Sequence, residues 1–225
     1  MPFDADTEFE LAKYRKAYTQ SPRYAMKSGT HIFLDEAKVR EYTKDLDKIS
    51  AADFGCGNGQ SALLLNEIGF SIVDLIDFVG YEFVHPDVKE LVEDGNARYF
   101  TYTLWGPAVK TLPTYDFTVC TDVMEHIPEK YVDEVMRTIR SKTRFNGVSY
   151  WRIALWGSET PEEKAKAKAK YGGELHVTVR PPEWWVEKLV KLYGKVDYEV
   201  WQNPRKPNRR VLIAFCSPDK TPPSE

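Results

Sequence analysis

Apolar residues follow two different periods along this chain of 225 residues. Up to residue 47 they recur at the spacing of amphipathic helices, which predicts helices over 5–25 and 34–47, the first ended or kinked by Pro22. From residue 49 onward, short apolar runs alternate with helical patterns, as in repeated β-α-β units. The runs predict strands over 49–54, 71–77, 97–104, 115–121, 147–155, 196–201 and 210–216. The helical patterns predict helices ending at Gly69, over 87–92, from Pro128 onward, and over 161–171 and 182–193.

This order of elements predicts an α/β fold. Repeated β-α-β units pair their strands in parallel through right-handed crossovers. We therefore expect a Rossmann-like, doubly wound, mostly parallel sheet of seven strands with an N-terminal helical cap. We expect a single domain over 1–225, in which 1–48 form the cap and 49–155 form the cofactor-binding half. The remaining 156–225 are expected to supply substrate-side helices and a final pair of strands.

Charge and composition narrow the functional classes. The formal net charge is −3 and the sequence pI about 5.9, whereas duplex nucleic-acid binders are normally basic, so a nucleic-acid partner is disfavoured. The basic residues Arg205, Lys206, Arg209 and Arg210 are interpreted as a solvated surface. Three cysteines are too few for a disulfide framework. No stretch approaches the roughly 18 apolar residues that span a membrane as a helix, so we predict a cytoplasmic location.

The segment Asp-Phe-Gly-Cys-Gly-Asn-Gly, residues 53–59, lies where a predicted strand turns into a helix. Ligands of such sheets bind outside the carboxyl ends of the strands. Glycines there allow a sharp turn and a close approach of a ligand to the backbone. Position 60 is Gln, so the spacing is G-x-G-x-G and not the dinucleotide fingerprint G-x-G-x-x-G. This disfavours a nucleotide-binding oxidoreductase and makes Asp53, Gly55, Gly57 and Gly59 the candidate residues.

A second acid, Asp77, ends the second predicted strand. A carboxylate offers several lone pairs, so it can accept hydrogen bonds from both hydroxyls of a ribose. Asp74 on the same strand is the second candidate for this role.

Two segments together resemble the class I methyltransferases that use S-adenosylmethionine (SAM). The first is the acid-led glycine run 53–59, and the second is 115–128, which ends in Asp-Val-Met-Glu-His-Ile-Pro. The resemblance covers 49–155 and implies that the Asp53 region and the three glycines surround the methionine part of SAM. It also implies that Asp77 holds the ribose, that Leu104 and Trp105 wrap the adenine, and that Asp122 lies beside the cofactor. The cap is expected to pack on the domain or cover SAM through Tyr14, Tyr18, Tyr24 and His31.

The acids and imidazoles after the fourth predicted strand are the candidates for catalysis. Asp122, Glu125 and His126 lie together, and His176 follows later in the chain. Two carboxylates and two imidazoles form a mixed oxygen and nitrogen donor set for Mn²⁺ or Mg²⁺. The pattern is similar to the E-x-x-E-H…H metal site of small-RNA 2′-O-methyltransferases, with Asp122 in place of a glutamate. Two alternatives remain open: His176 acting as a general base without a metal, and a structural role for both histidines.

These residues predict a SAM-dependent O-methyltransferase that acts on a hydroxyl of a small molecule or glycan. A hydroxyl is a poor nucleophile at neutral pH and needs a base or a metal ion. The segment 176–185, His-Val-Thr-Val-Arg-Pro-Pro-Glu-Trp-Trp, resembles methyltransferases of phages and large viruses, some of which act on glycans. We also consider an RNA ribose 2′-O-methyltransferase and a non-catalytic SAM-binding subunit.

Overall fold

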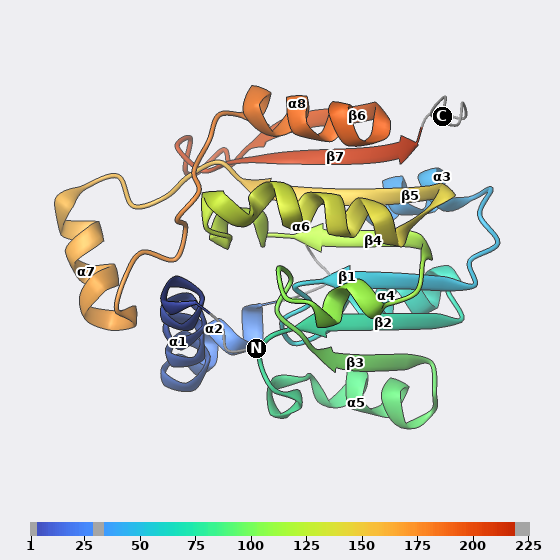
Figure 1. The fold of residues 1–225 in the computed structure, drawn as a ribbon, viewed down its shortest axis with the longest axis horizontal. Coiled ribbons are helices and arrows are strands. Elements are labelled where there is room, and N and C mark those ends of the chain that lie inside the picture. The colour runs from blue at the N-terminus through green and yellow to red at the C-terminus, as the bar shows by residue number, and fades with distance from the viewer. Residues whose placement is uncertain (1–3, 29–33, 219–225) are drawn as a thin grey trace.

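The computed structural model describes residues 4–28 and 34–218, so His31 and the last seven residues lie outside the described part. Its centre is a sheet of seven strands in the order β3-β2-β1-β4-β5-β7-β6 (Figure 1). The strands are β1 (Ser50–Phe54), β2 (Ile72–Asp77), β3 (Ala97–Thr101), β4 (Tyr115–Thr121), β5 (Thr143–Ala154), β6 (Gly194–Gln202) and β7 (Arg210–Pro218). The first five pair in parallel, and β7 runs antiparallel to both β5 and β6. The predicted mostly parallel, seven-stranded α/β fold is confirmed.

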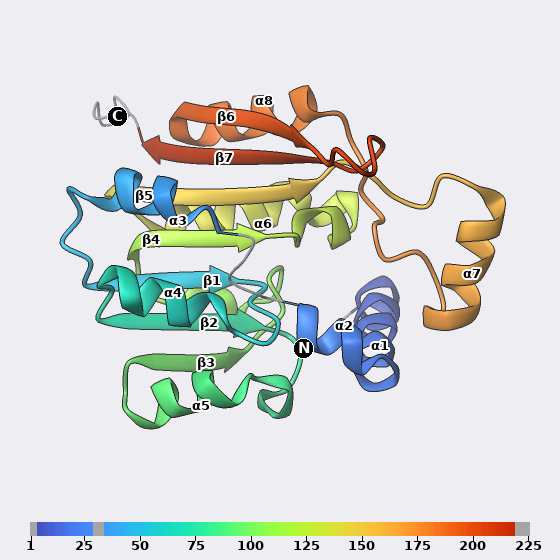
Figure 2. The same cartoon turned by 180° about the vertical axis from the view of Figure 1, so that it is seen from behind.

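Helices cover both faces of the sheet, as a doubly wound fold requires (Figures 1 and 2). One face packs against α6 (Glu129–Lys142) and α8 (Pro182–Tyr193), and the other against α3 (Glu36–Thr43), α4 (Ser61–Ile68) and α5 (Pro86–Glu93). Each face has its own buried apolar cluster, so the sheet is shielded from water on both sides. No helix of the described residues is long and apolar enough to cross a membrane.

Two strand boundaries differ from the prediction by three residues or more, and the others by two at most. β5 begins at Thr143, four residues early, because Thr143 pairs with Tyr115 before an irregularity shifts the register. β3 ends at Thr101, because the chain turns away after the amide of Tyr102 donates to the carbonyl of Asp77 over 2.8 Å. The site residues Leu104 and Trp105 therefore lie in a loop and not on a strand.

The cap lies across the carboxyl ends of the parallel strands (Figures 1 and 2). It consists of α1 (Ala5–Gln20) and α2 (Pro22–Lys27), which the proline separates as predicted. Beside α1 stands α7 (Pro161–Tyr171), which has no buried residue and projects away from the sheet. Short helical turns complete the chain at Tyr81–Phe83, Ala108–Thr111 and Met124–His126. The cap thus closes the edge of the sheet at which ligands of this fold class bind.

Candidate functional site

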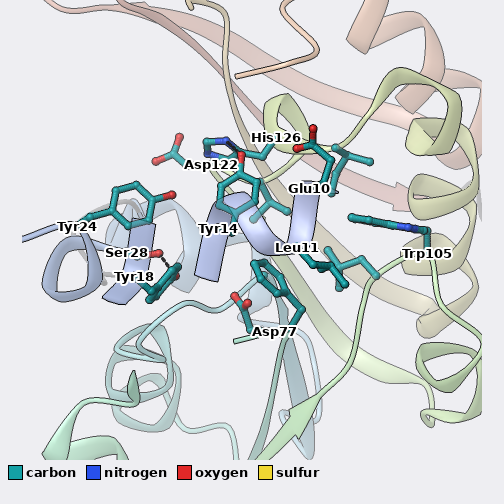
Figure 3. A pocket seen from close by; sticks show the side chains of 15 residues that line it. Glu10, Leu11, Tyr14, Tyr18, Tyr24, Ser28, Asp77, Trp105, Asp122 and His126 are labelled. Atoms are coloured by element: carbon teal, nitrogen blue, oxygen red, sulfur yellow. Dashed lines mark hydrogen bonds between the residues drawn. The ribbon is translucent and has the colours of Figure 1, made fainter. Parts of the chain in front are cut away.

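A cavity lies between the cap and the carboxyl ends of the strands (Figure 3). The cap contributes side chains from α1 and α2, and the sheet contributes the residues that follow β1, β2, β3 and β4. Its lining consists of Glu10, Leu11, Tyr14, Tyr18, Tyr24, Ser28, Gly55, Asp77, Phe78, Leu104, Trp105, Asp122, Val123, His126 and Ile127. Five of the residues predicted to bind a cofactor therefore meet in one place: Gly55, Asp77, Leu104, Trp105 and Asp122.

The glycine turn is shaped by positions that a larger residue could not occupy. Gly55 has φ +85°, and a Cβ there would lie 2.3 Å from Cγ2 of Val123. Gly57 has φ +56°, and a Cβ would lie 2.8 Å from the backbone of Ser28 in the cap. Left-handed φ and close approach together explain why this turn is built from glycine. The cap segment at Ser28 therefore rests directly on the turn.

Asp77 links the turn to the second strand. Its Oδ2 accepts a hydrogen bond from the amide of Gly57 over 2.8 Å, and its Oδ1 accepts one from the amide of Val79 over 3.1 Å. Burial raises the pKa of the Asp77 carboxyl, and these amide donors act in the opposite direction. The carboxylate still lines the cavity, where it has lone pairs to accept further hydroxyl donors.

Four other candidates lie outside the cavity lining: Gly57, which contacts the cap, and Asp53, Gly59 and Asp74. Asp53 is buried behind the turn, where one carboxylate oxygen accepts a hydrogen bond from Ser61, and burial raises its pKa to about 7. Gly59 approaches Leu75 on the sheet, so its role is close packing. Asp74, the second candidate for the ribose, is taken up by a bidentate pair with Arg98 and therefore does not face the cavity.

The loop after β3 supplies one end of the cavity. The Trp105 indole stacks on the ring of Tyr131, with centroids 5.2 Å apart and planes 8° from parallel. Its Nε1 donates to Oγ1 of Thr7 over 3.0 Å, which ties α1 to this loop. Trp105 is therefore fixed in orientation while one part of it lines the cavity with Leu104.

The cap contributes more to the cavity than packing. The hydroxyl of Tyr14 donates to the carbonyl of Leu175 over 2.6 Å and lies 2.6 Å from Nδ1 of His126. The hydroxyl of Tyr18 is hydrogen-bonded to Ser28. Tyr14, Tyr18 and Tyr24 were expected from the sequence to pack the cap or cover the cofactor, and all three line the cavity. Glu10 also lines it and was not predicted, because nothing in its sequence surroundings marks it.

The four predicted metal ligands separate into a group of three and one outlier. Glu125, His126 and His176 each offer a ligand atom, and these atoms all lie within 4.8 Å of one another. Asp122 is instead ion-paired with Arg152, which projects from the neighbouring strand β5. The prediction that Asp122 belongs with the other three ligands is therefore not supported by the geometry, since its carboxylate is already engaged.

Both imidazoles of this group are held through Nδ1. Nδ1 of His126 lies 2.9 Å from the carbonyl oxygen of Leu175, and Nδ1 of His176 contacts the carbonyl oxygen of Trp156. A carbonyl only accepts, so each contact is a hydrogen bond in the tautomer that is protonated at Nδ1 and keeps the Nε2 lone pair. Burial lowers the pKa of His126 to about 3 and lowers that of His176, which keeps both rings neutral.

Glu125 is fully buried, and neither of its carboxylate oxygens has a hydrogen-bond partner among the described residues. Burial and the nearby charge of Asp122 raise its pKa well above the usual range. Leaving a buried carboxylate unpaired is costly, so such a group is expected to meet a cation or a donor.

A second cavity adjoins the first and shares Asp122 and His126 with it. Its walls come from the residues that follow β4, from β5, from the segments on either side of α7 and from the β6–β7 hairpin. It is lined by Asp122, Glu125, His126, Arg152, Ala154, Trp156, His176, Trp201, Asn203, Arg209 and Val211. Trp156, Trp201, Asn203 and Arg209 are not predicted as site residues from the sequence. The last three reach this cavity only because the β6–β7 hairpin packs beside β5, and nothing in the sequence around Trp156 marks it.

Known protein families and solved structures were compared with the sequence and the fold of this chain. A methyltransferase-domain family matches residues 23–175, which is more than half of the chain. No curated protein matches the chain in sequence. The chain is similar to a 1,6-didemethyltoxoflavin-N1-methyltransferase from Burkholderia thailandensis, solved with 1,6-didemethyltoxoflavin and S-adenosylhomocysteine (SAH). That similarity has 18% identity and a TM-score of 0.61 and covers 97% of this chain and 93% of that one.

Two further structures show the same fold. The N-terminal domain of EvdMO1, solved in the presence of SAH and D-fucose, has 12% identity and a TM-score of 0.57, with 82% of each chain covered. An O-methyltransferase family protein from Burkholderia thailandensis has 14% identity and a TM-score of 0.52, and 81% of this chain is covered. This chain spans only 56% of the length of that protein. The chain therefore belongs to the methyltransferase-domain family, with the class I fold of the enzymes that take their methyl group from SAM.

Proposed function

We propose that the protein is a SAM-dependent O-methyltransferase that acts on a hydroxyl of a small molecule or sugar. SAM would occupy the first cavity, with its methionine part along the glycine turn. Asp77 would accept the two ribose hydroxyls, and Leu104 and Trp105 would enclose the adenine. The acceptor would occupy the second cavity, and the methyl group would pass between the two at Asp122 and His126, which line both.

The observation that carries this proposal is the Glu125, His126 and His176 group in the wall of the second cavity. Two imidazoles that keep the Nε2 lone pair in the Nδ1-protonated tautomer, and a buried carboxylate without a hydrogen-bond partner among the described residues, fit a divalent metal ion. Histidine ligands of metals usually donate their other N–H to a carbonyl or carboxylate, and both rings have a backbone carbonyl at Nδ1 for this. Two nitrogen donors suit Mn²⁺ better than Mg²⁺, which prefers oxygen ligands. When bound, such an ion lowers the pKa of a coordinated hydroxyl and so supplies the nucleophile.

The chain's own residues would position the reactants. Leu175 and Tyr14 orient the His126 ring, so the cap takes part in holding the acceptor side of the site. Arg152 holds the Asp122 carboxylate in place between the two cavities. In the reaction the S–CH₃ bond of SAM breaks as the O–CH₃ bond forms, SAM leaves as SAH, and the hydroxyl proton passes to solvent. Holding donor and acceptor in line in this way supplies much of the rate.

The lining of the second cavity supports a small acceptor. Sugars stack on aromatic rings, and Trp156 and Trp201 both line this space. The EvdMO1 domain, which was solved with D-fucose, shares the fold and supports a sugar as one acceptor class. The toxoflavin enzyme is an N-methyltransferase, so transfer to nitrogen is the competing function. The metal-type donor set favours oxygen, because an aromatic or amino nitrogen needs no metal ion to become nucleophilic.

Product chemistry and metal dependence test this proposal together. The protein is incubated with labelled SAM and matched acceptor pairs, such as a sugar and its amino sugar or a phenol and its aniline. We expect labelled ethers only, formed with Mn²⁺ and not with EDTA. Glu125→Gln should abolish this activity while SAH affinity is retained, and the exposed Glu129→Gln serves as the control. Label on nitrogen at the same rate with EDTA would refute O-methylation through this site.

A further inference from the structure

Arg209 is the feature of the second cavity that the proposed reaction does not use. It lies at the end of the tight turn between β6 and β7 and is half-buried. Its guanidinium carbon lies 4.2 Å from the centre of the Trp156 ring, so the indole supports one side of the cation. The sequence places this arginine among the basic residues of a solvated surface, whereas in the fold it lines the cavity.

The backbone of the turn holds this side chain in place. The amide of Asn203 donates to the carbonyl of Arg209 over 3.0 Å, and the amide of Arg209 donates to the carbonyl of Lys206 over 2.8 Å. The side-chain oxygen of Asn203 accepts from the amide of Arg205 over 2.9 Å. This bond fixes the Asn203 amide, whose NH₂ group has no partner within the described ranges. Arg209 and Asn203 therefore present hydrogen-bond donors from the same turn to the same cavity.

Arg209 has no close counterion among the described residues, although its charge acts on the more distant carboxylate of Glu163 at the start of α7. Arg152 and Asp122 are paired with one another. Across residues 4–28 and 34–218, no carboxylate forms an ion pair with Arg209. In the proposed function Glu125 is engaged by a divalent cation, which adds positive charge beside a sulfonium donor. An acceptor that brings a negative charge of its own would balance this excess.

We infer that Arg209, with the Asn203 amide, binds an anionic group of the acceptor, so that the substrate is a hydroxyl compound that also carries a carboxylate or a phosphate. A guanidinium presents a planar fork of donors that matches both groups. The ring of Trp156 beneath the cation limits the positions the fork can adopt. This inference rests on the proposed function for the excess positive charge and for naming the bound molecule as the acceptor, but the anion site itself can be measured without turnover.

The anion site is tested with sulfate, which binds metal ions weakly and resembles a phosphate group. Equilibrium dialysis of labelled sulfate against SAH-saturated protein with Mn²⁺, at low ionic strength, measures its affinity. We expect saturable binding that falls at least fivefold in Arg209→Gln. The control is Arg210→Gln, which removes a neighbouring exposed arginine that does not line the cavity and should leave the affinity unchanged. SAH affinity should be the same in both variants.

Competition then distinguishes the two anionic groups. D-glucuronate and D-glucose 6-phosphate are compared with D-glucose as competitors of the labelled sulfate. We expect at least one of the two acids to displace sulfate from the wild-type protein, and neutral glucose to fail. Equal sulfate affinity in the wild-type protein and Arg209→Gln, or no saturable binding in either, would overturn the inference. A wild-type protein that does not bind SAH at all would instead count against the proposed function.

Discussion

Replacing Asp77 with asparagine is expected to weaken cofactor binding strongly while the chain stays folded. The carboxylate is buried, at 6% exposure, and holds both the Gly57 amide and the Val79 amide. Asparagine keeps one acceptor oxygen, so it can retain one of these bonds, but it loses the charge and the second acceptor. The ribose hydroxyls of SAM would then lose a charge-assisted hydrogen bond.

A hydrogen bond to a charged group contributes about 1.5–3 kcal/mol. That range corresponds to a loss of SAH affinity of roughly 10- to 150-fold, since each 1.4 kcal/mol or so is a factor of ten. Isothermal titration calorimetry with SAH measures the change, and circular dichroism confirms that the variant is folded. Asp74→Asn is the matched control on the same strand, because Asp74 binds Arg98 and does not line the cavity. An SAH affinity within twofold of wild type in Asp77→Asn would refute the ribose assignment.

Two further predictions concern the turn. Gly57→Val should lower SAH affinity at least tenfold, because the added Cβ would lie 2.8 Å from the backbone of Ser28. Gly95→Val is the control, since Gly95 also has a left-handed φ but a Cβ there would meet nothing within 4 Å. Equal SAH affinity in the two variants would contradict the prediction. Asp53 has a folded pKa of about 7 against an ordinary 3.8, so the stability it contributes is present at low pH and is lost as pH rises between these values. Relative to Asp53→Asn, the wild-type free energy of unfolding should fall by on the order of 3 kcal/mol from pH 4 to pH 7. Urea unfolding of both proteins at the two pH values measures this change. A difference in unfolding free energy between the two proteins that stays constant with pH would rule it out.

The fold could be predicted from the sequence because the signals are local. Alternation of apolar runs with helical patterns marks each β-α unit, and the acid-led glycine turn marks the edge of the sheet that binds a ligand. Asp77 could be placed because it ends a strand, and Leu104 and Trp105 because they lie in the loop after the next strand, since the carboxyl ends of parallel strands meet at one edge. Their binding roles stay predictions, as does the cytoplasmic location.

The remaining part of the site depends on contacts between segments far apart in the sequence. Asp122 was grouped with the metal ligands because it is close to Glu125 along the chain, but Arg152 on the adjacent strand pairs with it. Tyr14 reaches His126 only after the cap has folded over the sheet. Arg209 enters the second cavity because β7 inserts between β5 and β6 and carries its turn to the site. A linear pattern contains none of these pairings.

The central claim is that Glu125, His126 and His176 hold a divalent metal ion at the acceptor site. Calorimetric titration of Mn²⁺ into metal-stripped, SAH-saturated protein tests it most directly. We expect one Mn²⁺ per chain in the wild-type protein, with binding lost in Glu125→Gln and His176→Ala and retained in Asp122→Asn, whose carboxylate pairs with Arg152. Mn²⁺ affinity that is unchanged in Glu125→Gln and His176→Ala, or no binding to the wild-type protein, would contradict the account.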